Sequence, residues 1–120
     1  MKRVITIILV TCFLFGCAGN RTWTKQDTAR EVTWEILHVV DWQQTRYIAN
    51  HRYEYHELNP ILGSHPSERA VNIYMGVSAI AHPIISYALP DPYRKWFQYL
   101  SIGVTSGCVI NNIAIGIPIW

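Results

Sequence analysis

The sequence lacks the features that most often identify an enzyme or a nucleic-acid-binding protein. Neither a Gly-x-Ser-x-Gly elbow nor a glycine-rich phosphate loop occurs among its 120 residues. Its formal net charge is only +2, whereas nucleic-acid-binding domains carry a clustered basic excess. These absences disfavour the common nucleophilic hydrolases and nucleotide-binding enzymes. They also remove nucleic acid from the expected partners.

Cysteine is scarce as well, and no cysteine pair is available to build a structural zinc site. His56-Glu57 begins like the helical motif of zinc proteases, but Pro60 stands where that motif needs its second histidine. His51 and His65 are the other histidines of this region. We predict no metal ion and no cofactor, and a metal site formed by these histidines with Glu57 is the alternative.

The N-terminus is built like an export signal. Two basic residues precede an uncharged run over 4–15, and small residues follow at 16–19. The segment ends on Cys17 and resembles the lipobox of bacterial lipoproteins. That resemblance implies that residues 1–16 are removed as a signal peptide and that Cys17 is acylated, for example with palmitate. Residues 17–26 would then form a lipid-anchored tether.

The remaining cysteine, Cys108, would have no partner for an intrachain disulfide once Cys12 is removed and Cys17 is lipidated. We predict that Cys108 is a small apolar packing residue. The mature chain would be formally neutral, because the two basic residues of the signal leave with it.

Charge divides the rest of the sequence into two halves. After residue 69 only Asp91, Arg94 and Lys95 are formally charged, which leaves uncharged runs over 70–89 and 96–120. Each run is long enough to cross a hydrocarbon core as a helix, and a turn with two prolines separates them. We predict an all-α membrane protein with a transmembrane hairpin over 70–120. The alternative is a buried hairpin of a soluble protein.

The basic turn and the small residues of the second run add detail to this hairpin. With the lipidated N-terminus outside, Arg94 and Lys95 would lie on the cytoplasmic side, as the positive-inside tendency requires. The inner membrane is therefore the expected location, with the outer membrane as the alternative. Gly103 and Gly107 have the small-xxx-small spacing that allows helices to approach closely, and we predict that they pack against another helix.

The polar half, residues 27–69, is expected to form one amphipathic helix and a loop. Asp27 or Thr28 can cap a helix, and apolar residues recur with helical periodicity to about Ala49. A loop rich in aromatic and histidine residues is expected over 50–67. The helix would lie on the outer surface of the membrane or pack on the hairpin.

One group of polar residues interrupts the apolar stripe of this helix. Asp41, Gln44 and Thr45 lie at i, i+3 and i+4, so their side chains share one face. A carboxylate on a packing face is costly unless it is paired. We therefore expect Asp41 to find a partner, and the nearby candidates are Arg46, Arg52 and His56.

The same residues take part in a wider pattern, which continues in the loop with Glu57-x-Asn59-Pro60. Asp-x-x-Gln-Thr followed by Glu-x-Asn-Pro is similar to a pattern found in small, uncharacterised multi-helix membrane proteins of bacteria and their phages. That resemblance implies a compact helical membrane fold without an established activity. We interpret the pattern as a polar clasp, in which Asp41 and Glu57 accept hydrogen bonds from Thr45, Asn59 or the loop backbone.

His82 is a further candidate, because ionisable residues inside apolar helices are often functional. It precedes Pro83, which frees a backbone carbonyl, and we predict that His82 bonds to that carbonyl. The alternatives are a proton relay and a ligand site.

These observations predict a lipid-anchored protein of the bacterial cell envelope with an interaction or structural role. Its expected partners are the lipid bilayer and either another membrane protein or a second copy of itself. The alternative is a membrane-associated hydrolase or metal-binding protein that uses Asp41, Glu57 and histidines.

Overall fold

The computed structural model describes residues 22–119, and this part of the chain folds into three helices without a strand. The helices are α2 (Lys25–Asn50), α3 (Glu68–Ala88) and α4 (Tyr93–Ala114). The predicted all-α class is confirmed. The signal peptide and Cys17 lie outside the described residues.

Helix α2 begins at a reciprocal capping box. The Thr24 hydroxyl accepts a hydrogen bond from the Asp27 backbone N–H at 3.1 Å, and the Asp27 carboxylate accepts one from the Thr24 N–H at 2.8 Å. The cap therefore lies one turn earlier than Asp27 or Thr28, where we expected it, since Thr24 and Asp27 have the required three-residue spacing. The helix ends at Asn50, close to the predicted end.

The two uncharged runs form α3 and α4. The Ser67 hydroxyl caps α3 by accepting from the Ala70 N–H at 3.1 Å. Pro83 lies inside α3 without ending it. Helix α4 begins at Tyr93, inside the segment that we expected to be a turn, because proline is well tolerated just before the first turn of a helix.

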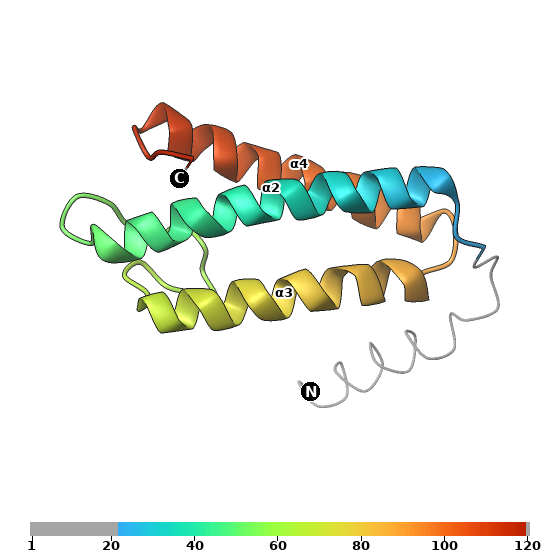
Figure 1. The fold of residues 1–120 in the computed structure, drawn as a ribbon, viewed down its shortest axis with the longest axis horizontal. Coiled ribbons are helices and arrows are strands. Elements are labelled where there is room, and N and C mark those ends of the chain that lie inside the picture. The colour runs from blue at the N-terminus through green and yellow to red at the C-terminus, as the bar shows by residue number, and fades with distance from the viewer. Residues whose placement is uncertain (1–21, 120) are drawn as a thin grey trace, which may run out of the picture.

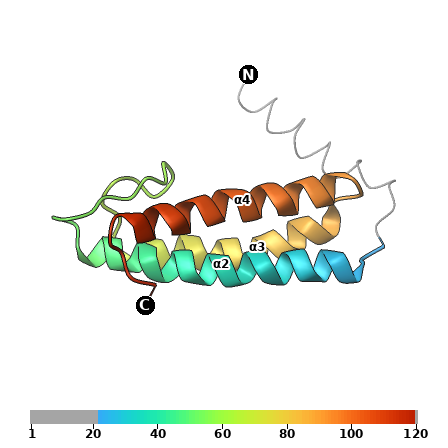
Figure 2. The same ribbon diagram turned by 90° about the horizontal axis from the view of Figure 1, so that it is seen from above.

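The three helices lie side by side, and α2 contacts both of the others (Figures 1 and 2). Helices α3 and α4 are joined by a short turn but contact each other less than either contacts α2. Of the two placements expected for the first helix, the structure shows the one in which it packs on the other two. The physical reason is that α2 carries Asp27 and Glu31, whose hydrogen-bond partners lie on α3 and α4.

The interior of the bundle is polar and its outer surface is apolar. Buried polar residues outnumber buried hydrophobic ones, and they are Asp27, Glu31, His38, Gln44, Thr45, His82, Ser86, Arg94, Gln98, Thr105 and Asn112. The exposed hydrophobic residues of α3 and α4 include Ile73, Val77, Ile80, Ile84, Trp96, Leu100, Val104 and Ile110. This distribution is the reverse of the one usual for proteins in water.

Within residues 22–119 no helix combines the length and the apolar content needed to cross a membrane. The transmembrane hairpin expected over 70–120 is therefore unsupported, although both of its uncharged runs are helical.

The two glycines of α4 lie away from the helix contacts. Gly103 and Gly107 are exposed, and a Cβ atom added at either would meet no other atom within 4 Å. Helix α4 turns Thr105 inward, and two residues correspond to about 200° around a helix. Among residues 22–119, no neighbouring helix therefore lies against the predicted packing motif.

Candidate functional site

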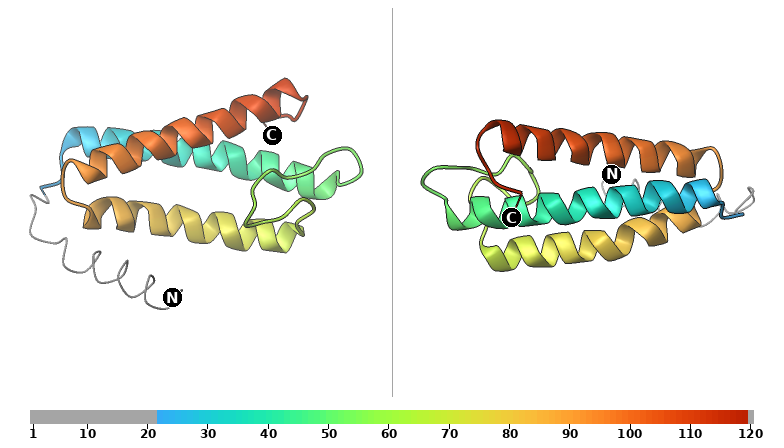
Figure 3. Two further views of the ribbon diagram at one scale, coloured as in Figure 1. Left: turned by 180° about the vertical axis from the view of Figure 1, so that it is seen from behind. Right: turned by 45° about the horizontal axis from the view of Figure 1, so that its top comes forward.

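A cavity of about 930 Å³ lies between the loop over 51–67, α2 and α4. The loop and the C-terminal end of α4 lie at the same end of the bundle (Figure 3). The lining residues are Asp41 and Ile48 from α2, Met75 from α3, Val104, Gly107, Cys108, Asn111 and Asn112 from α4, Ile115 and residues 54–60. Side chains from opposite halves of the sequence therefore meet here.

Asp41 and Glu57, the two carboxylates of the predicted clasp, both face this cavity. Glu57 accepts a hydrogen bond from the Asn59 backbone N–H at 3.0 Å, and the Asn59 side chain accepts one from the Ile61 N–H at 2.9 Å. Asp41 has no hydrogen-bond or ion-pair partner within residues 22–119. Burial and the negative charge of Glu57 raise the pKa of Asp41 to about 7.

The other residues of the predicted clasp are placed differently. The Gln44 carbonyl oxygen accepts a hydrogen bond from Asn112 at 3.2 Å, while its amide nitrogen is buried without a partner in the described chain. Thr45 is buried but does not line the cavity. Neither residue binds Asp41, so the clasp is not closed as we expected.

The two arginines proposed as partners of Asp41 are engaged elsewhere. Arg46 donates to the Glu68 carboxylate, with 3.0 Å between Nε and Oε1, and this contact lowers the pKa of Glu68. Arg52 donates to the His65 backbone carbonyl at 3.1 Å. His56 lines the cavity but makes no hydrogen bond to Asp41 in the described part of the chain.

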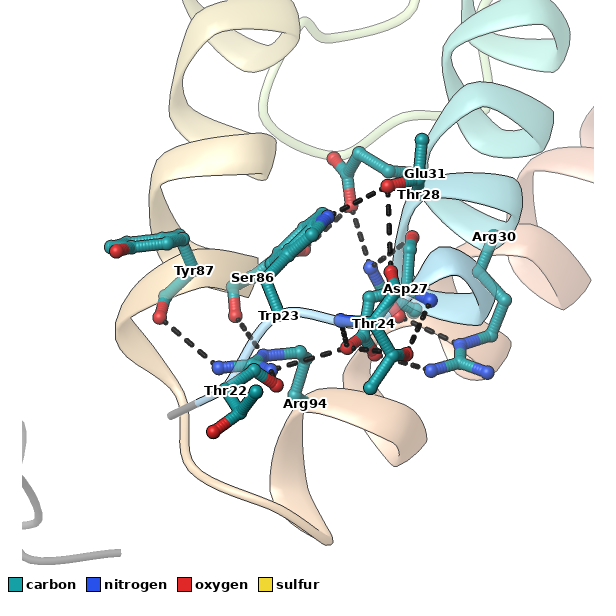
Figure 4. Close-up of polar contacts among 11 residues, drawn as sticks. Thr22, Trp23, Thr24, Asp27, Thr28, Arg30, Glu31, Ser86, Tyr87 and Arg94 are labelled. Carbon is teal, nitrogen blue, oxygen red and sulfur yellow. Dashed lines mark hydrogen bonds and ion pairs between the residues drawn. The ribbon is translucent and has the colours of Figure 1, made fainter. Parts of the chain in front are cut away.

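A second polar cluster fills the opposite end of the bundle and surrounds Arg94 (Figure 4). The Arg94 guanidinium is fully buried; Nη1 lies 3.3 Å from the Asp27 carboxylate, and Nε donates to the Ser86 carbonyl at 2.9 Å. Asp27 also receives hydrogen bonds from Thr24 and Arg30. Burial raises the pKa of Asp27, but these hydrogen bonds and the charges of Arg94 and Arg30 outweigh it, so the pKa is lowered.

Sequence reasoning placed Arg94 in the turn between the two uncharged runs, whereas the structure places it inside the bundle. Arg94 lies in the first turn of α4 and is 0% exposed. One feature of the sequence could have indicated this burial: Arg94 is one of only three charged residues after residue 69. A lone arginine beside a long uncharged run must either face water or meet an acidic residue from another segment.

Glu31 connects α2 to both other helices and was not predicted as a site residue. Its carboxylate contacts His82 Nδ1 at 2.6 Å and accepts hydrogen bonds from Ser86 at 2.8 Å and Gln98 at 2.9 Å. Burial raises its pKa, but the three hydrogen bonds prevail and lower it. His82 therefore binds a carboxylate, whereas we had expected it to bind the carbonyl freed by Pro83.

His82 is also fixed by aromatic rings and lies apart from the cavity. Its ring stacks on Trp34 with 3.6 Å between centroids, and on Phe97 with 4.5 Å. The second ring nitrogen, Nε2, is buried and has no hydrogen-bond partner among residues 22–119. Asp41 and His82 are thus members of two separate polar sites.

The cavity offers carboxylates and amides but no activated nucleophile. Cys108 is exposed as a residue, in contrast to our expectation of a packing residue. Its thiol is partly covered, and this partial burial together with the charges of Asp41 and Glu57 raises its pKa. A thiol with a raised pKa is a poor nucleophile. Within residues 22–119 no group of three His, Cys, Asp or Glu side chains is arranged to hold a metal ion.

Comparison with known proteins adds no family to this description. No family model matches the sequence, and no curated protein or solved structure is significantly similar to it.

Proposed function

We propose that this chain is an interaction or structural protein of the bacterial cell envelope whose helical bundle contacts the acyl chains of a membrane. A lipid on Cys17 would hold it there in addition. The observation that carries the proposal is the apolar outer surface around a polar interior. In water, apolar patches of this extent mark interaction sites.

The energetic argument rests on the outer faces of α3 and α4. Ile80 is 67% exposed, Ile84 62% and Ile110 65%. Complete burial of such a side chain is worth roughly 1.5–3 kcal/mol, so lipid contact along the bundle would gain on the order of 1 kcal/mol for each. This gain in free energy requires only that the outer face of a helix is apolar, whereas a helix that crosses a membrane must be apolar over most of its surface.

The distribution of charge on the surface also supports lipid contact. The exposed charged residues within residues 22–119 lie near the ends of the bundle, at Lys25, Asp91 and Lys95 or at Arg52, Glu54 and Arg69, and Glu35 in the middle of α2 is only partly exposed. Charge in the middle of the surface would be costly against acyl chains. The exposed residues in the middle of α3 and α4 are instead mostly hydrophobic.

The proposed role is interaction because an apolar surface explains contact and does not explain turnover. The partners that such a surface can bind are lipid and the apolar faces of other membrane proteins or of a second copy of this chain.

A membrane-associated hydrolase is the second candidate, favoured by Asp41 and Glu57 facing one cavity. A pair of carboxylates of which one is protonated near neutral pH can supply an acid and a base. Asp41→Asn separates the two candidates. It would abolish hydrolysis while leaving membrane contact unchanged.

The proposed membrane contact is tested by removing the lipid anchor. We expect that a chain whose residues 1–17 are replaced by a cleavable export signal without lipidation stays in the membrane after a high-salt wash at neutral pH, where lysine side chains are charged. Adding Val77→Lys and Ile84→Lys should release it, since a charge against acyl chains costs about 2.5–3.5 kcal/mol or more. The readout is the distribution of the protein between pellet and supernatant.

The matched control adds the same charge at exposed positions near the ends of the bundle, with Gln26→Lys and Tyr53→Lys. This control should remain in the pellet. Release of the unlipidated parent chain, or equal retention of the two double-lysine variants, would contradict the proposal.

A further inference from the structure

The cavity beside the loop is rich in acidic groups and poor in cationic ones. Asp41, Glu54 and Glu57 line it, and none of its lining residues is Lys or Arg. Asp41 has no partner within residues 22–119, although it is partly buried. An enclosed carboxylate without a partner is costly, and a positively charged ligand would satisfy it.

Most of the remaining wall is apolar. Ile48, Met75, Val104 and Ile115 come from the helical side, and Leu58 comes from the loop. The volume of about 930 Å³ lies at the upper end of the range of small-molecule sites. An inorganic ion would fill a small part of this space, so the cavity suits a ligand with an extended apolar portion.

We infer that this cavity binds an amphipathic amine, with its ammonium group between Asp41 and Glu57 and its alkyl chain along the apolar wall. An ammonium group donates hydrogen bonds and carries the charge that two carboxylates require. An anion of the same shape would be repelled by both. The inference concerns the cavity alone and does not depend on membrane contact by the outer faces.

Cys108 provides a readout at the site, because it is exposed and lines the cavity. The full chain, in a non-ionic detergent at pH 8, is treated with iodoacetamide in the presence of octylamine or octanoate. The modification of the Cys108 peptide is followed by mass spectrometry, which separates it from Cys12 and Cys17. We expect octylamine to slow the modification of Cys108, and octanoate, which has the same chain length, to leave it unchanged.

Substitutions assign the effect to the two carboxylates. Asp41→Asn is expected to weaken protection by octylamine at least about tenfold in concentration, as loss of a charge-assisted hydrogen bond predicts. Asp41→Asn combined with Glu57→Gln should remove it. Asp91→Asn, in the turn at the opposite end, should retain full protection. Circular dichroism checks that the variants keep their helical content.

Equilibrium dialysis of radiolabelled octylamine gives the stoichiometry independently of Cys108. One bound amine per chain in the wild type, lost in the double variant, is the expected result. Three results would each overturn the inference: equal protection by octanoate, unchanged amine binding in the double variant, or no saturable binding of octylamine in the wild type.

Discussion

Replacing Arg94 with methionine is expected to destabilise the bundle by about 3–5 kcal/mol, the usual cost of removing one partner of a buried ion pair. The Arg94 guanidinium is 0% exposed and lies 3.3 Å from the carboxylate of Asp27. It also donates to the backbone carbonyls of Thr22, Ser86 and Tyr87. Methionine fills similar space but leaves these acceptors without their donor.

The effect is measured by urea unfolding followed by circular dichroism. The neighbouring Lys95 is exposed, so Lys95→Met removes the same charge without opening the cluster and should change stability by less than about 0.5 kcal/mol. Equal unfolding midpoints for the two variants would show that the buried cluster does not hold α2 and α4 together.

Replacing Asp41 with asparagine is expected to stabilise the protein at pH 8 by up to about 4 kcal/mol, because each tenfold change in the ionisation constant of the acid is worth about 1.4 kcal/mol. Burial and the charge of Glu57 raise the pKa of Asp41 from 3.8 to about 7 in the folded state. A raised pKa means that the folded state prefers the protonated acid. Ionisation therefore opposes folding progressively as the pH rises from about 4 to about 7, and asparagine removes that penalty.

The measurement is the free energy of unfolding of both proteins at pH 5 and pH 8. Taking the difference between them cancels the contributions of groups distant from Asp41, whereas Glu57 and Cys108, which interact with Asp41, remain part of the measured effect. The free energy of unfolding of Asp41→Asn should exceed that of the wild type by more at pH 8 than at pH 5. Asp91→Asn, at an exposed site, should show the same difference from the wild type at both pH values. An equal gain at both pH values would contradict the raised pKa.

A carboxylate that weakens the fold at neutral pH is consistent with a binding role. Positions that oppose stability without a structural compensation are often functional. The same substitution is therefore expected to improve stability and to weaken amine binding.

The helices and the position of Asp41 could be predicted from sequence because both depend on local periodicity. Uncharged runs, capping residues and the i, i+3, i+4 spacing are short-range patterns. The Asp-x-x-Gln-Thr and Glu-x-Asn-Pro segments likewise indicated that Asp41 and Glu57 belong together, and both line one cavity. The hydrogen bonds that we predicted for Asp41 are not present within residues 22–119. They could not be predicted from sequence, because the rotamer and the partners of Asp41 depend on the fold.

The second polar cluster could not be predicted, since its contacts join residues far apart in the sequence. Arg94 meets Asp27 across 67 positions, and Gln98 meets Glu31 across 67. In the sequence these residues look like ordinary solvent-facing charges and amides. Only the three-dimensional arrangement shows that they face inward and that most isoleucines and valines of α3 and α4 face outward.

The most direct test of membrane contact is a photolabelling map. The full chain is placed in vesicles that contain a phospholipid with a diazirine in its acyl chain, and the adducts are located by mass spectrometry after illumination. We predict adducts on outer residues such as Ile80, Ile84 and Ile110, and none on the buried Ser86 and Gln98. Adducts confined to residues 1–26, with none on α3 or α4, would contradict the account, because they would show that only the N-terminal segment touches lipid.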